Sequence, residues 1–290
     1  MMATAVHTGA AVGGGIVLGL LLSGVVIWAI LAQRFRQSGI PMPRHFVFLR
    51  SRHWSAYDLL LVGVLVSSAV LFFSFLGHWL QHMAVEARLL HIVAALQNTL
   101  LQLLVGGILI RRMRVAGSTI RESFGSVDDS YSDGKQVIAQ VITWYVALLP
   151  AIFFAALVSQ FIFAHIGMEH SFQPILVFFS DTATPEWFRW WVVGVAVIVA
   201  PIIEEVFFRG VLLPVLLQKY RLWIPLIGSS MLFALVHGHL PSMLPLFVLG
   251  LGLGGAYLYT GNLLVPIGIH ALFNGVSLLL VLLAGLPDAL

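Results

Sequence analysis

Residues 201–210 read PIIEEVFFRG, and they place two adjacent glutamates and one arginine in a stretch that is otherwise apolar. The surrounding residues, from 189 to 217, continue this apolar character for longer than the about 20 residues that a membrane-spanning helix needs. An ionised side chain at the centre of a bilayer costs at least about 2.5 kcal/mol, so such residues are usually paired, face a cavity or serve a function. The stretch therefore predicts a spanning helix whose charges need partners.

Composition extends this interpretation to the whole chain. Of 290 residues, 60% are hydrophobic and only 9% are charged, whereas ordinary soluble domains contain about 25% charged residues. The chain is therefore predicted to be an integral membrane protein. Its net charge of +3 does not indicate nucleic-acid binding, because the basic residues lie in short clusters between apolar runs. The absence of cysteine excludes disulfide bonds and thiolate catalysis.

Hydropathy predicts an all-α, polytopic membrane protein of about eight transmembrane helices. The eight candidate segments are residues 8–32, 57–77, 89–110, 137–165, 189–217, 223–238, 242–259 and 263–284.

Basic residues orient these segments. Of the 15 Lys and Arg residues, 12 follow the first, third or fifth segment, which places them on one side of the membrane if the helices alternate in direction. The positive-inside rule predicts that this side is cytoplasmic and that both termini lie outside. The pattern fits a prokaryotic cytoplasmic membrane, and it fits the endoplasmic reticulum as well. The 12 residues are Arg34, Arg36, Arg44, Arg50, Arg52, Arg111, Arg112, Arg114, Arg121, Lys135, Lys219 and Arg221.

Three regions follow from this pattern: a three-helix membrane region over residues 1–115, a polar cytoplasmic loop over residues 116–136, and a five-helix core over residues 137–284. Within the core, residues 250–255 read GLGLGG. This run lies in an apolar segment without the strand that a dinucleotide-binding motif requires, so it predicts close helix packing through small residues.

The charges of the opening stretch divide into two roles. Successive helical residues are separated by about 100°, so Glu204 and Glu205 point in different directions. Glu205 and Arg209 are four residues apart, which predicts an ion pair along one face of the helix. Glu204 has no such partner in its own helix and is predicted to be the free acid or base. The alternative is that both glutamates bind Arg209 in one buried network.

Two histidine clusters lie in the later segments. FALVHGH (residues 233–239) carries His237, and HALFN (residues 270–274) carries His270 and Asn274 on one helix face. At 1.5 Å per residue, Glu204 and His237 lie roughly 21 and 24 Å from the QKYR turn that joins their helices, so the two side chains can meet. By the same rule His270 lies only roughly 12 Å from Asn262, and a recessed TGN turn (residues 260–262) would be needed to bring it to that depth.

The sequences EEVFFRG, FALVH and HALFN match, in order, the EExxxR, FxxxH and HxxxN motifs of the CAAX prenyl protease and bacteriocin-processing (CPBP, Abi) family of intramembrane proteases. The chain resembles this family over residues 137–284. The resemblance implies a glutamate-type endopeptidase in which Glu204 and His237 activate a water molecule. It also implies that His270 and Asn274 stabilise the oxyanion, and that Glu205 and Arg209 support the site.

The residues leave the cofactor open. Glu204, His237 and His270 would form a His₂Glu set compatible with zinc, but the local HExxH pair of many zinc proteases is absent. A metal-free mechanism without a cofactor is therefore favoured, with zinc as the alternative. The resemblance implies a peptide or membrane-protein substrate in contact with the bilayer, and in eukaryotic relatives this substrate is lipidated. A proton-coupled transporter and a non-catalytic immunity protein are the alternative functions.

Overall fold

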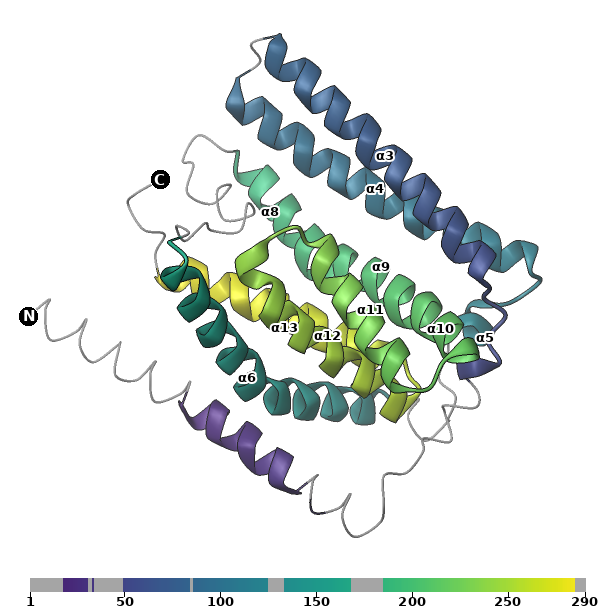
Figure 1. Ribbon diagram of the computed structural model, residues 1–290, viewed down its shortest axis with the longest axis vertical. Helices are drawn as coiled ribbons and strands as arrows, with labels where there is room; N and C mark the ends of the chain where they lie inside the picture. Colours follow the sequence, from purple (N-terminus) through teal and green to yellow (C-terminus); the bar gives the residue numbers. More distant parts are fainter. Residues whose placement is uncertain are drawn as a thin grey trace, which may run out of the picture.

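The computed structural model describes residues 18–30, 33, 49–83, 86–124, 133–167 and 185–284 (Figure 1). Five of its helices are long and apolar enough to cross a membrane, and three shorter apolar helices accompany them. The predicted all-α polytopic architecture is thereby confirmed. Three of the predicted cytoplasmic arginines, Arg34, Arg36 and Arg44, lie outside the described residues, as do both predicted external termini.

The helices are shown in Figure 1 in chain order. A first helix, Leu18–Ile30, is followed by α3 (Ala56–His82), α4 (Ala87–Val115), α5 (Ile120–Phe124) and α6 (Gly134–His165). One continuous helix, Glu186–Lys219, comprises α8 (Glu186–Gly194), the π-helical turn η2 (Val195–Val199), α9 (Ala200–Phe207), the π-helical turn η3 (Phe208–Leu212) and α10 (Leu213–Lys219). The last three helices are α11 (Trp223–Val236), α12 (Leu240–Thr260) and α13 (Leu264–Ala284).

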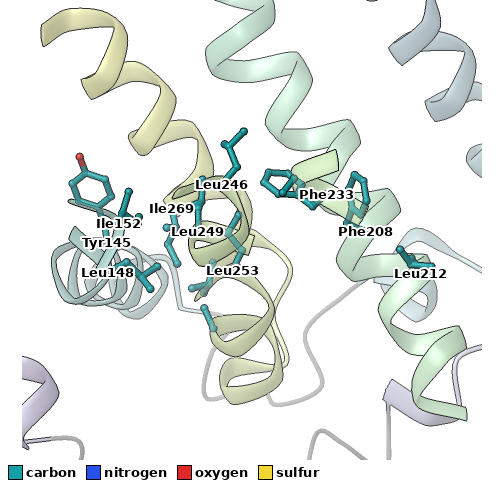
Figure 2. Close-up of a cluster of buried hydrophobic side chains, with 13 residues drawn as sticks. Tyr145, Leu148, Ile152, Phe208, Leu212, Phe233, Leu246, Leu249, Leu253 and Ile269 are labelled. Carbon is teal, nitrogen blue, oxygen red and sulfur yellow. The ribbon is translucent and has the colours of Figure 1, made fainter. Parts of the chain in front are cut away.

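The helix α12 occupies the centre of the five-helix core, where it packs against α6, α11 and α13 (Figure 1). The helices α3 and α4 form a hairpin beside this core, and α4 contacts α9. Aliphatic and aromatic side chains from several helices meet between them, including Leu148 of α6, Phe208 of η3, Leu249 of α12 and Ile269 of α13 (Figure 2). This core fixes the orientation of the helices that carry the three motifs.

The predicted basic side of the membrane is assembled by polar contacts between distant segments. The Gln218 side-chain amide at the end of α10 donates to the backbone carbonyls of Arg52 and Trp54, at 3.2 and 2.9 Å. Asp58 in the first turn of α3 forms an ion pair with Arg112 near the end of α4, at 2.6 Å. The start of α3 and the ends of α4 and α10 therefore lie together, as the charge pattern predicts. That this side is cytoplasmic stays a prediction.

The polar stretch after α4 is only partly an irregular connection. It contains the short helix α5, in which the Ser123 side chain is fully buried. The Phe124 ring lies 5.6 Å from the buried ring of Trp54, and an Arg52 guanidinium nitrogen donates to the Glu122 carbonyl. This part of the predicted polar loop thus closes one end of the bundle, while residues 125–132 lie outside the described residues.

Two prolines explain the π-helical turns of the long helix. The turn η2 ends immediately before Ala200 and Pro201, and η3 ends immediately before Leu213 and Pro214. A proline ring inside a helix clashes with the carbonyl of the fourth residue before it, and a wider turn with one extra residue relieves that clash. The helix therefore continues through both prolines, and α9 between the two turns carries Glu204 and Glu205.

Interior prolines also leave backbone carbonyls without their helical donor, and in lipid such carbonyls need another partner. Pro245 in α12 frees the Pro241 carbonyl, to which the Ser159 hydroxyl of α6 donates at 2.6 Å. The Ser159 hydroxyl thus replaces the missing backbone donor from a neighbouring helix. Near Pro150 of α6, the Trp28 indole N–H of the first helix donates to the adjacent Ala147 carbonyl at 2.6 Å.

The predicted close packing through the GLGLGG run is confirmed. A methyl group added at Gly250 would lie 3.0 Å from the Ser230 Cβ and 3.1 Å from its backbone Cα, whereas at Gly255 it would lie 3.8 Å from the nearest atom, on Trp144. We expect Gly250→Ala to destabilise the protein by about 1–3 kcal/mol, because α11 and α12 must move apart. A thermal unfolding assay of the detergent-solubilised protein measures this effect. An unchanged Tm for Gly250→Ala, or an equal loss for the control Gly255→Ala, would contradict it.

Candidate active site

The opening motif forms a buried ion pair. Glu205 and Arg209 are both 0% exposed, and an Arg209 guanidinium nitrogen lies 2.8 Å from Glu205 Oε1. The other terminal nitrogen of Arg209 donates to the Gly250 carbonyl of α12 at 3.0 Å. This geometry confirms the predicted pairing four residues apart. The close approach of α12 at Gly250 therefore also brings that carbonyl within reach of the guanidinium.

The Glu204 carboxylate faces two imidazoles. Its Oε2 atom lies 3.9 Å from His237 Nε2 and 3.9 Å from His270 Nε2. The same oxygen is buried and has no hydrogen-bond partner among the described residues. The structure therefore brings together Glu204 of α9, His237 at the end of α11 and His270 of α13, as the sequence predicts for these three.

The opposite nitrogen of each imidazole is fixed by an acceptor. His237 Nδ1 lies 2.7 Å from the Phe233 carbonyl, and His270 Nδ1 lies 2.9 Å from Glu205 Oε1. Since both partners accept hydrogen bonds, each Nδ1 carries the proton and donates it. A neutral imidazole held in this way turns an unprotonated Nε2 toward Glu204.

Three electron-pair donors thus converge on one small region. A water molecule that contacts two groups at about 2.8 Å spans a separation of 3.9 Å between them with an angle near 90° at its oxygen. The side chains of Glu204 and His237 are 23% and 29% exposed, whereas that of His270 is 2% exposed. The cluster is therefore open on the side of Glu204 and His237, and His270 lies on its buried side.

The two turns that flank the site differ in burial: the TGN turn is buried, whereas the turn of His237 and Gly238 is exposed. The helix α11 has only 14 residues and ends at the turn of His237 and Gly238, where Gly238 has a positive φ of 64°. On the other side, Thr260 and Asn262 are 0% and 4% exposed, so the TGN turn is recessed. The count from Asn262 predicted that His270 would need such a recess to reach Glu204, and its Nε2 atom lies 3.9 Å from Glu204 Oε2.

Phe233 packs against three of the predicted site side chains. Its ring is 0% exposed, and its centroid lies 4.8 Å from that of His237 and 5.5 Å from that of His270. The Arg209 guanidinium carbon lies 4.7 Å from the same centroid, a cation–π distance. Figure 2 shows Phe233 beside Phe208 in the core. The sequence motif alone did not assign this side chain a role, which depends on contacts between helices.

Asn274 does not form a pair with His270. Its amide nitrogen donates to the Ala196 carbonyl in η2 at 2.8 Å, and the His270 Nδ1 proton is directed at Glu205. One amide N–H of Asn274 remains for another acceptor. The predicted roles of His270 and Asn274 as oxyanion donors stay predictions.

The residue types of the site suit zinc, but their spacing is wide for it. Tetrahedral zinc with ligand bonds of about 2.0–2.1 Å holds its ligand atoms about 3.3 Å apart. The Glu204 oxygen lies 3.9 Å from each imidazole nitrogen, and no group of three His, Asp or Glu residues with metal-binding geometry occurs in the described part of the chain. Side-chain movements of about half an ångström would be needed to hold the metal.

Comparisons with known proteins gave a family match over the region that carries this site and a match to one curated relative. A family model described as type II CAAX prenyl endopeptidase Rce1-like matches residues 185–276. A protein of Escherichia coli described as "Uncharacterized 24.3 kDa protein" is 35% identical over 78 residues, which cover 25% of this chain and 36% of that relative. The chain therefore spans little more than a third of the length of this relative. No solved structure matches the chain. The resemblance predicted from the three motifs is confirmed by this family match, which covers residues 185–276 and includes all three motifs.

Proposed function

We propose that the protein is an intramembrane endopeptidase of the glutamate type. The observation that supports this proposal is the position of the Glu204 carboxylate, which lies 3.9 Å from two imidazole nitrogens whose rings are anchored on their other side. A carboxylate beside an imidazole in an apolar, partly hydrated site can accept a proton from a bound water. The match of residues 185–276 to an endopeptidase family supports the same reaction.

The proposed reaction begins with a water molecule held between Glu204 and His237. Glu204 accepts a proton, and the water oxygen forms a bond to the carbonyl carbon of the substrate peptide. The resulting oxyanion is stabilised by His270 and the remaining amide N–H of Asn274. The proton held by Glu204 then passes to the leaving nitrogen as the C–N bond breaks, which gives a carboxylic acid and an amine; the acid then loses its proton to the amine or to water.

His270 has a special requirement in this scheme. Its Nδ1 proton is directed at Glu205, so its Nε2 can donate to an oxyanion only when the imidazole is protonated. The Glu205 carboxylate accepts the Nδ1 proton of His270, and the pair with Arg209 fixes the orientation of that carboxylate. We therefore assign Glu205 and Arg209 a supporting role behind His270.

The proposed substrate is a peptide or a segment of a membrane protein that reaches the site from the bilayer. CAAX-type cleavage of a lipidated C-terminus and the maturation of a peptide such as a bacteriocin both fit an intramembrane site of this family. Comparing the proteomes of membranes with wild-type protein and with Glu204→Gln protein tests the proposal. New peptide termini that appear only with the wild-type protein are expected, and identical termini in both membranes would contradict it.

A metal-free mechanism makes a further prediction. Dialysis of the purified protein against a strong chelator should leave peptide cleavage unchanged within about twofold, because Glu204 and His237 suffice to polarise the water. If zinc were held by Glu204, His237 and His270, it would supply Lewis-acid activation of that water. Activity that is lost on dialysis and restored by added zinc would therefore overturn the metal-free proposal. Metal analysis of the same samples provides the control.

A further inference from the structure

The backbone just before Glu204 contains a carbonyl that the helix cannot satisfy. In η2 the Ala200 N–H binds the Val195 carbonyl, five residues earlier. In the same pattern the next N–H, that of residue 201, would bind the Ala196 carbonyl. Residue 201 is proline and has no N–H, so the Ala196 carbonyl lacks its helical donor.

Asn274 supplies the missing donor from α13. Its amide nitrogen lies 2.8 Å from the Ala196 oxygen, and α13 packs directly against η2. The arrangement repeats what Ser159 does for the Pro241 carbonyl that Pro245 frees in α12. An unsatisfied carbonyl in lipid costs several kcal/mol, so such a substitute donor fixes the geometry of the interrupted turn.

We propose that Asn274 is a positioning residue that holds η2 in its π-helical form and thereby sets the position of Glu204 relative to His270. This inference rests on the proposed proteolytic function. The turn η2 leads directly into α9, and one residue gained or lost there rotates α9 by about 100° and shifts it by about 1.5 Å. His270 lies four residues before Asn274 on the same face of α13. The hydrogen bond from Asn274 to the Ala196 carbonyl therefore connects α13, which carries His270, to the turn that leads into α9, which carries Glu204.

A cycle of variants at Asn274 and Pro201 separates this role from that of an oxyanion donor. Asn274→Ala should lower both Tm and kcat, the latter by about a hundredfold, because a misplacement of about 1 Å has that effect on catalysis. Pro201→Ala restores a backbone N–H that can bind the Ala196 carbonyl. The double variant should therefore regain most of the Tm, and it should regain kcat only if the wide turn, and with it the position of Glu204, is kept without Pro201.

A matched control uses the Pro241 carbonyl, which also lacks its helical donor but takes no part in the proposed reaction. Ser159→Ala should lower Tm, and Ser159→Ala with Pro245→Ala should regain it, while kcat stays unchanged in both. An Asn274→Ala protein with wild-type Tm would overturn the proposal, and so would a double variant that regains neither Tm nor kcat. Because Tm needs no substrate, this part of the test remains decisive even if no peptide is cleaved.

A second variant covers the case in which Pro201→Ala does not fold. Asn274→Asp preserves the shape of the side chain, and its carboxyl group donates to the Ala196 carbonyl only when it is protonated. The Tm of this variant, relative to the wild-type protein, should therefore fall as the pH is raised from about 5 to about 8. A difference in Tm that does not change with pH would overturn the proposal.

Discussion

Glu204→Gln is expected to lower the kcat for peptide cleavage by about 10²- to 10⁴-fold, the usual contribution of a general base. Glutamine preserves the volume of the side chain but cannot accept the proton of the attacking water. The Glu204 Oε2 atom has no hydrogen bond among the described residues, so the folded protein loses little when it is replaced. Single-turnover cleavage and thermal unfolding measure the two effects, and Tm should stay within a few degrees.

The control for this variant is Glu186→Gln, which changes an exposed carboxylate at the start of the same long helix. It should preserve both kcat and Tm. Normal cleavage by Glu204→Gln would remove Glu204 from the mechanism. A folded Glu204→Gln protein that binds peptide without cleaving it would support the assignment.

Arg209→Met is expected to destabilise the protein by about 3–5 kcal/mol, because it leaves the Glu205 carboxylate buried without its cation. Both side chains are 0% exposed, so water cannot replace the lost partner. The expected result is a large loss of folded yield and of Tm in detergent. Arg221→Met, at an exposed arginine just after α10, is the control and should leave both unchanged.

A double variant separates the effect of the unpaired charge from the effect of the changed side-chain volume. Glu205→Leu with Arg209→Met replaces two buried charges by apolar side chains, which is often neutral for stability. This variant should fold better than Arg209→Met alone. It should still fail to cleave peptides, because His270 loses the carboxylate that its Nδ1 contacts at 2.9 Å. A double variant with wild-type kcat would show that Glu205 does not support His270.

The sequence predicts contacts within a helix better than contacts between helices. The Glu205–Arg209 pair follows from helical periodicity alone, and the structure confirms it at 2.8 Å. The meeting of Glu204 and His237 follows from counting residues back from their shared turn. The bond from His270 to Glu205 depends on how α13 is rotated against α9, and no spacing in the sequence contains that rotation.

Prolines in the sequence indicate backbone carbonyls that lack a helical donor. Pro201 lies only three residues before Glu204, and it implies that a nearby carbonyl needs a donor from elsewhere. The sequence thus predicts that a donor is needed, but it does not predict which residue supplies it. The structure identifies that partner as Asn274, for which the family resemblance implied a role at the oxyanion.

The short span of α11 has a consequence for the surrounding lipid. Its 14 residues rise only about 21 Å, whereas the hydrocarbon core of a bilayer is about 30 Å thick. Acyl chains beside α11 must therefore shorten or tilt, or polar solvent must occupy the remaining depth above His237. Because of this hydrophobic mismatch, the amount of water around His237 should depend on the acyl-chain length of the surrounding lipid.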